Sequence, residues 1–236
     1  DENQFIDLFL PSDGGEKRPL IILIHGGCWR DQYDLVPMGQ FAQALTAHGC
    51  AVASLEYRRL GNGGGWPNTF LDVAAAADFL KTRLDGRPVG VIGVSLGGAA
   101  ALLGESPVDA DAVVLEGVYS AIEQAAGNRL AMRLGKIGRL LAPLLVWQIK
   151  PRIGVDPDDL APIMAIRRLE GPVMIIAGTE DRRTRLDESK ALYLQATSSK
   201  RLWLIHGARH EDFHRHSAAE YERRVGRFFD DHLAAH

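Results

Sequence analysis

Short apolar runs alternate along the chain with longer stretches in which apolar residues recur at helical spacing. The apolar runs have the nearly continuous hydrophobicity of strands buried on both faces; they cover residues 20–25, 51–56, 88–93, 112–115, 173–177 and 202–205. Helices are expected near 38–48, 69–84, 96–104, 187–195 and 217–232. This alternation predicts an α/β fold with a doubly wound, mostly parallel sheet. The opening segment 5–10, before Pro11, is expected to add an antiparallel edge strand.

The helix expected from residue 69 begins with a capping pattern. Thr69 has the position of an N-terminal cap, and Asp72 follows three residues later. Its carboxylate would then lie near the positive end of the helix dipole.

One stretch breaks the alternation. Nearly sixty residues separate the runs at 112–115 and 173–177, far more than a crossover connection needs. Residues 129–150 within it carry interleaved Arg and Lys and are apolar at Leu130, Leu134, Ile137, Leu140, Leu141, Leu144, Leu145 and Trp147. We predict a single domain over 1–236 with a helical cap insertion at about 119–162. Two alternatives stay open: a crossover helix packed on the sheet, and a basic helix on a membrane surface, interrupted by Pro143.

Composition narrows the possible partners. The net charge of −3 is close to neutral for 236 residues, so nucleic-acid binding is not expected. Basic residues are scattered, and the dense stretch Arg182, Arg183 and Arg185 is interpreted as a solvated loop. Apolar runs fall short of the roughly 18 residues of a membrane span, so stable membrane insertion is not expected.

The two cysteines are interpreted as free thiols. Cys28 follows the first buried strand and Cys50 precedes the next, so in parallel neighbours they lie at opposite ends of the sheet. A strand of five or six residues separates them by roughly 17–20 Å, beyond disulfide reach. Free thiols favour a cytoplasmic location. Because the chain begins with Asp1 rather than Met, the hypothesis of a removed signal peptide stays open.

The strongest chemical signal is the sequence Gly93-Val94-Ser95-Leu96-Gly97-Gly98. It directly follows a buried strand and opens an Ala-rich helix. This context favours a sharp strand-to-helix turn that exposes a nucleophilic serine, with small residues on either side allowing close packing. A glycine-rich turn that only tightens packing is the weaker alternative. We therefore predict Ser95 as the nucleophile.

A second glycine-rich loop, His25-Gly26-Gly27-Cys28-Trp29, ends the first buried strand. Such a loop lets backbone N–H groups turn toward the oxyanion of a tetrahedral intermediate. The predicted donors are the amides of Gly27, Cys28 and Leu96. His25 is interpreted as a residue that braces the loop.

An acid and a base are expected after the last two strands, since this architecture has the chain order Ser, Asp, His. Asp181 in Gly178-Thr179-Glu180-Asp181 is the predicted acid, with Glu180 as its competitor. His210 is the predicted base, because its loop is long enough to reach back over the sheet. The competing histidines are His206, His214 and His216. The same four histidines could also hold a metal ion, which is kept as an alternative hypothesis. We predict that no metal is bound.

These motifs together resemble the α/β-hydrolase superfamily over essentially the whole chain. The segments DLFLP, HGGCWRDQ and EYRRLGNGGGWPNTFLDVAAAADFL are also similar to small carboxylesterases, to kynurenine formamidase-like enzymes and to hydrolases related to prolyl oligopeptidase. The resemblance implies an oxyanion hole from the HGGxW loop and a triad that cleaves an acyl bond without a cofactor. Val94 departs from the pattern, because many relatives carry His, Glu or Gln there.

The sequence therefore predicts a serine hydrolase that acts on a small-molecule carboxylic ester. An amidase or aminopeptidase, including an arylformamidase-like enzyme, is the first alternative, and a non-catalytic binding module on the same fold is the second. Trp29, Tyr57 and Trp66 follow strand ends on the catalytic side and are candidates for pocket walls, with core packing as an equal alternative. Leu144 and Trp147 of the cap are expected to close that pocket.

Overall fold

The computed structural model describes residues 3–12, 18–27, 35–83 and 86–233. Seven strands form one sheet: β1 Phe5–Phe9, β2 Leu20–Ile24, β3 Ala51–Glu56, β4 Val89–Val94, β5 Ala112–Glu116, β6 Val173–Gly178 and β7 Lys200–Ile205. Their order in the sheet is β1-β3-β2-β4-β5-β6-β7. β1 pairs antiparallel with β3, and the other neighbours are parallel. The expected doubly wound, mostly parallel sheet with an antiparallel edge strand is confirmed.

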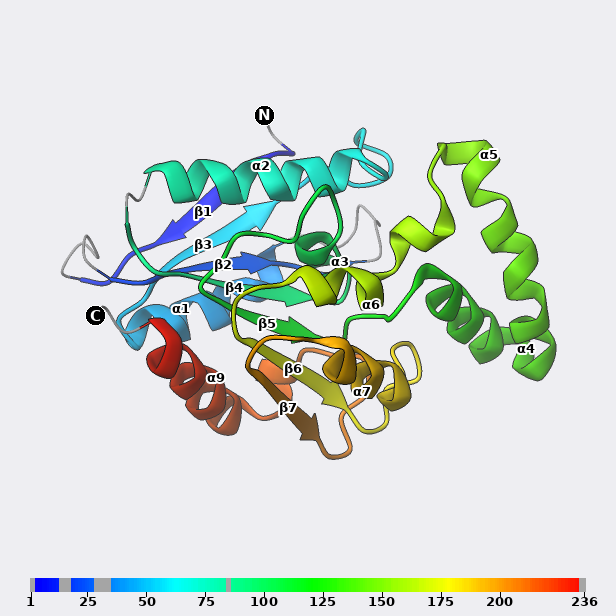
Figure 1. The fold of residues 1–236 in the computed structure, drawn as a ribbon. Coiled ribbons are helices and arrows are strands. Elements are labelled where there is room, and N and C mark those ends of the chain that lie inside the picture. The colour runs from blue at the N-terminus through cyan, green and yellow to red at the C-terminus, as the bar shows by residue number, and fades with distance from the viewer. Residues whose placement is uncertain (1–2, 13–17, 28–34, 84–85, 234–236) are drawn as a thin grey trace.

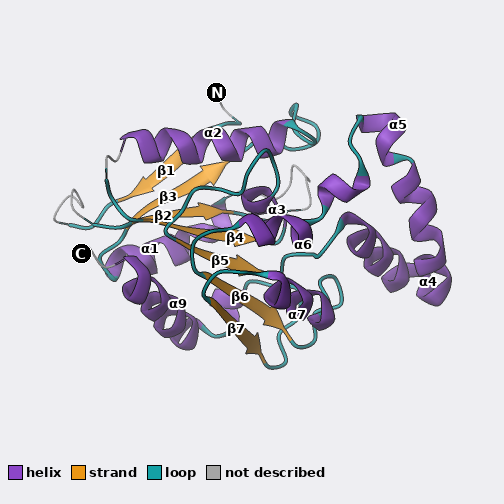
Figure 2. Ribbon diagram, viewed as in Figure 1, coloured by secondary structure: helices purple, strands orange, loops and turns teal. Residues whose placement is uncertain are grey.

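The helices lie on both faces of the sheet (Figures 1 and 2). Their bounds are α1 Gly39–Ala47, α2 Asn68–Arg83, α3 Leu96–Leu102, α4 Ile122–Trp147, α5 Ile149–Ile153, α6 Pro162–Ala165, α7 Leu186–Gln195, α8 Phe213–His216 and α9 Ala218–Leu233. In the described part of the chain, short 3-10 turns cover Val36–Met38, Pro157–Leu160 and Ile166–Arg168.

Two apolar layers hold the helices on the sheet. One contains buried residues of α2, α3, α6 and α7, among them Phe70 and Leu192. The other contains residues of α1, α8 and α9, among them Phe41 and Phe228. β2 to β6 are buried along almost their whole length, since helices cover both of their faces. No described helix is long and apolar enough to cross a membrane.

The start of α2 differs from the expected capping pattern. Thr69 lies inside the helix, and its buried hydroxyl donates to the Arg58 carbonyl (2.6 Å) and accepts from the Gly65 N–H (3.0 Å). The Asp72 carboxylate binds the Arg58 guanidinium through Nε (2.9 Å) and Nη2 (2.7 Å). The Thr69 hydroxyl and the Asp72 carboxylate, which the sequence pattern predicted to cap the helix, therefore bind the loop that precedes it.

The long connection between β5 and β6 forms a helical hairpin beside the sheet. Helical backbone in α4 breaks at Gly135, which has φ 61° and ψ −144°, so α4 consists of two arms. Figure 1 shows α4 and α5 projecting from the body beyond the carboxyl ends of the strands. The arms meet through small residues: a Cβ added at Gly138 would overlap the backbone of Leu130.

We predict that Gly138→Ala separates the two arms of α4. Alanine has the better helix propensity by up to about 1 kcal/mol, but overlap with the Leu130 carbonyl outweighs this gain. The matched control is Gly127→Ala, whose added Cβ would make an ordinary contact with the Ala142 Cβ at 3.7 Å. Hydrogen exchange across 122–147 measures the effect, since a projecting hairpin can open locally. Equal protection in the two variants would contradict the close packing described here.

Candidate active site

Ser95 occupies the turn between β4 and α3. It has φ 50° and ψ −108°, and no other described non-glycine residue has a positive φ. Such backbone costs on the order of 1–3 kcal/mol and persists only where the surroundings fix it. The Ser95 N–H donates to the Glu116 carbonyl at the end of β5 (2.7 Å). A Cβ added at Gly97 would overlap the carbonyl oxygens of Ile24 and His25, so α3 packs directly on the end of β2.

Asp181 and His210 meet at the same edge of the sheet. The Nδ1 atom of His210 lies 2.8 Å from Oδ2 of Asp181, whose side chain is 1% exposed. The other oxygen, Oδ1, accepts from the N–H groups of Arg183 (2.7 Å) and Thr184 (2.9 Å). Because the carboxylate is an acceptor, Nδ1 of His210 carries the hydrogen in this pair. The Nε2 atom is then left as the proton acceptor of the ring.

The competing acid and histidines have other surroundings, although His214 lines the same cavity as Ser95 and His210. Glu180 is exposed, and its Oε2 atom lies 3.8 Å from Nε of Arg209. His206 is exposed as well. The side chain of His214 contacts Glu222 (2.9 Å), and that of His216 contacts Glu211 (3.2 Å). Within the described ranges, no group of three or more His, Cys, Asp or Glu residues is arranged to hold a metal ion.

Ser95 and His210 line a common cavity of about 370 Å³ at the carboxyl edge of the sheet. Gly26 and Gly27 form part of its wall, and Met38, Phe41 and Val94 are among its apolar residues. The loop after β2 supplies this wall, and Ser95 follows β4. These two strands are neighbours, and the chain continues from them in opposite directions across the sheet. Open α/β sheets bind ligands at such a switch point.

Tyr57 and Glu56 hold the start of the loop after β2 in place. The ring of Tyr57 stacks on His25 with centroids 4.3 Å apart, and its hydroxyl donates to the His25 carbonyl (2.6 Å). Nε2 of His25 lies 3.2 Å from the buried Glu56 carboxylate, which also accepts from the Tyr57 N–H (3.1 Å). Burial alone would raise the pKa of Glu56, but the hydrogen bond and charge of His25, with Arg59 nearby, lower it. His25 thus occupies the bracing position expected from the sequence.

The other predicted binding residues have different positions. Cys28 and Trp29 lie outside the described residues. Leu96 is buried as the first residue of α3. Tyr57 is buried beneath the loop, and Trp66 is half-buried against Phe70.

Leu144 and Trp147 lie on the projecting α4 with exposed side chains, and the structure does not bring them to the described cavities beside Ser95 or Asp181.

The Oε1 atom of Glu116, also on the wall of the Ser95 cavity, accepts a hydrogen bond from the buried hydroxyl of Tyr221 in α9. Burial raises the pKa of Glu116 to about 8, opposed by the bond from Tyr221 and assisted by the charge of Asp212. Sequence reasoning did not select this residue, although an acidic side chain at the end of the apolar run 112–115 is an available signal.

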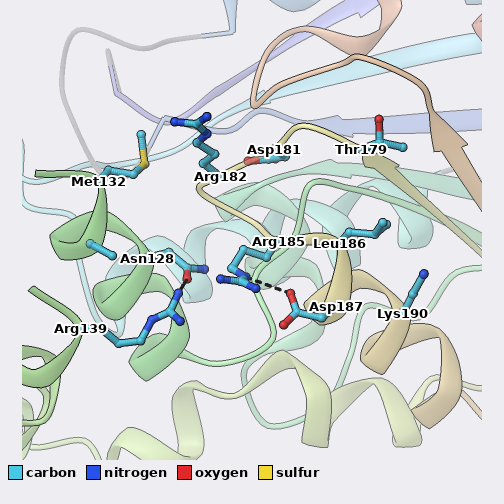
Figure 3. A pocket seen from close by; sticks show the side chains of 11 residues that line it. Asn128, Met132, Arg139, Thr179, Asp181, Arg182, Arg185, Leu186, Asp187 and Lys190 are labelled. Atoms are coloured by element: carbon cyan, nitrogen blue, oxygen red, sulfur yellow. Dashed lines mark hydrogen bonds and ion pairs between the residues drawn. The ribbon is translucent and has the colours of Figure 1, made fainter. Parts of the chain in front are cut away.

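A second cavity, of about 770 Å³, lies between α4 and the start of α7 (Figure 3). Arg139, Arg182, Arg185 and Lys190 line it, and Asp181 lies on its wall. The Arg185 guanidinium contacts Asp187 (3.1 Å), and Arg139 donates to Asn128 (3.4 Å). Arg182 and Arg185, from the stretch expected to be a solvated loop, thus line a cavity that has Asp181 on its wall.

Esterases and a lipase are among the solved structures with this architecture. An esterase of Thermogutta terrifontis, solved with propionate bound, is 17% identical and superposes with a TM-score of 0.77 over 98% of this chain and 91% of that one. The Pyrococcus furiosus esterase PF2001 is 18% identical, with a TM-score of 0.71 over 98% and 92%. A Paleococcus ferrophilus monoacylglycerol lipase is 18% identical, with a TM-score of 0.66 over 97% and 99%. The fold is that of the α/β hydrolases.

Sequence comparisons give a family match and two curated relatives. Residues 6–127 match the model of the BD-FAE family. The human protein ABHD12B is 27% identical over 79% of this chain and 52% of its own length; YqkD of Bacillus subtilis is 23% identical over 78% and 63%. The chain thus spans half to three fifths of these two relatives. It belongs to the BD-FAE family and has the α/β-hydrolase fold.

The raised pKa of Glu116 should make the free energy of unfolding depend on pH. Its folded pKa of about 8 exceeds its ordinary value of 4.5. The folded protein therefore keeps a proton that the unfolded chain loses, so this group makes folding less favourable as pH rises from about 4.5 to about 8. Glu116→Gln should gain stability relative to the wild type between pH 5 and pH 9, as measured by paired thermal melts. A difference in melting temperature that does not change with pH would contradict this assignment.

Proposed function

We propose that this protein is a serine carboxylesterase with Ser95 as nucleophile, His210 as general base and Asp181 as the acid that orients it. The observation that carries the proposal is the 2.8 Å pair of Asp181 and His210, together with Ser95 on the wall of the cavity that His210 lines. The strained turn at Ser95 supports it, since backbone strain of this kind concentrates at functional residues.

The mechanism follows from the protonation of this pair. Nε2 of His210 takes the hydroxyl proton as Oγ of Ser95 attacks the acyl carbon. Asp181 fixes the tautomer and stabilises the imidazolium. His210 then protonates the departing alkoxide, leaving an acyl-enzyme. Water, activated by the same ring, hydrolyses that intermediate and restores Ser95.

Backbone N–H groups supply the oxyanion hole in this proposal. The Leu96 amide follows the nucleophile at the start of α3, and Gly27 lies on the cavity wall. Cys28, the third donor proposed from the sequence, would act through its amide. Donors fixed before the reaction lower the barrier because they need no reorganisation as charge develops.

The cavity supports short acyl groups as substrates. The cavity of about 370 Å³ shared with the catalytic side chains has room for a short acyl group beside Phe41 and Met38. The Thermogutta terrifontis esterase was solved with propionate and with butyrate bound, and both are short acyl groups.

Ser95→Ala tests the nucleophile. We expect hydrolysis of p-nitrophenyl butyrate to fall by a factor on the order of 10⁴ or more, because the acyl-enzyme cannot form. Circular dichroism checks that the variant is folded. A folded variant that kept a tenth of the wild-type rate would overturn the assignment.

A substrate panel tests the reaction class. We expect p-nitrophenyl acetate, propionate and butyrate to be cleaved faster than long-chain esters, aminoacyl anilides or N-formylkynurenine. Since hydrophobic discrimination is worth roughly 10- to 200-fold per group, the preference should be clear in kcat/KM. A higher kcat/KM for an anilide or for N-formylkynurenine would replace the esterase with an amidase.

A further inference from the structure

The second arm of α4 presents an apolar face to solvent. Ile137, Leu140, Leu141 and Leu144 follow the i, i+3, i+4, i+7 spacing of one helix face. Their side chains are exposed, Leu140 to 78%, and Trp147 continues the face at 75%. The packing contact with the first arm lies to one side, through Gly138 and Ala142, which are buried. The hairpin therefore buries its small residues and leaves its large apolar residues outside.

Positive charge is concentrated on the same segment. Residues 124–155 contain six basic and no acidic residues: Arg129, Arg133, Lys136, Arg139, Lys150 and Arg152. The chain has a net charge of −3 and this segment +6, so the remainder carries −9. Asp156, just beyond the segment, binds Lys150 (2.7 Å), and Arg139 turns inward to Asn128. Arg133 and Lys136, on either side of the break at Gly135, have exposed side chains.

The position of the hairpin relates this face to the site. Figure 1 shows α4 and α5 beyond the carboxyl ends of the strands, which is the edge that carries Ser95, Asp181 and His210. Asn128 and Met132 of the first arm line the cavity that has Asp181 on its wall. A surface that contacts the outer face of the hairpin would therefore lie near the catalytic edge rather than behind the sheet.

We infer that this hairpin docks on an anionic lipid surface. Leucine, isoleucine and tryptophan side chains insert at the boundary of the acyl chains while Arg and Lys of the same segment contact acidic headgroups. A fluid bilayer needs no preformed groove, which suits a projecting convex face. Two hairpins facing each other would bring together two segments of charge +6, which disfavours a symmetric dimer through this face. The helix lies on the bilayer and does not cross it.

Vesicle sedimentation of the full chain tests the inference. We expect binding to vesicles of phosphatidylcholine mixed with phosphatidylglycerol, little binding to phosphatidylcholine alone, and weakening with added NaCl. Leu140→Glu should reduce binding at least about ten-fold. The matched control Leu194→Glu changes a leucine of similar exposure (71%) at the far end of α7 and should bind as the wild type does.

The basic residues have their own test. Arg133→Gln with Lys136→Gln should weaken binding by roughly 20- to 30-fold, since each cation near an anionic surface contributes about five-fold. Arg223→Gln, on α9, removes a cation of the body and should have little effect. Brominated lipids should quench fluorescence in the wild type and quench it much less in Trp147→Phe. Hydrolysis of soluble p-nitrophenyl butyrate should be unchanged in Leu140→Glu, which separates docking from catalysis.

Three results would overturn the inference. The first is a wild type that does not sediment with the anionic vesicles. The second is equal binding by Leu140→Glu and the wild type. The third is a concentration-dependent oligomer, abolished by Leu140→Glu and formed without vesicle binding, which would assign the face to a second copy of this chain.

Discussion

Close packing of α3 on the ends of β2 and β4 is the constraint on which the catalytic edge depends. Gly97 lies against the carbonyl oxygens of Ile24 and His25 with no space for a side chain. The Ser95 backbone, held at φ 50°, is tied to the end of β5 through the Glu116 carbonyl. Four elements from three parts of the sequence thus fix one residue, and the cost of its strain is spread over the packing of the sheet. A looser turn would leave the serine without a defined direction.

The same edge organises the other groups. β6 and β7 are parallel neighbours, so the loops that follow them emerge side by side, and their residues Asp181 and His210 meet at 2.8 Å. Asp181 is held by two backbone N–H groups, which limits its movement. Tyr57 and Glu56, at the end of β3, brace the loop after β2 in a comparable way. The site is therefore built from strand ends, while the hairpin of α4 lies to the side with its apolar residues in solvent.

Much of this arrangement could be predicted from the sequence because it follows from local patterns. Continuous apolar runs gave the strands, and Ser95, Asp181 and His210 each follow a strand end in the expected order. Contacts between distant segments could not be predicted in this way. Glu116 and Tyr221 are 105 positions apart, and neither lies in a motif that would select it. Thr69 and Asp72 matched a capping pattern, yet the Arg58 loop binds both side chains. The exposure of Leu144 and Trp147 likewise depends on how the two arms pack through Gly138, which helical periodicity does not encode.

Covalent labelling measures the central claim most directly. An organophosphonate ester of p-nitrophenol should react with the hydroxyl group that, in the proposed mechanism, His210 activates, and should release one p-nitrophenol per chain. Mass spectrometry of peptides from the inactivated protein should then place one phosphonyl group on Ser95. Labelling should be much slower in His210→Ala, because the hydroxyl loses its base. Complete inactivation with the label on another residue, or full activity after Ser95 is labelled, would contradict the account.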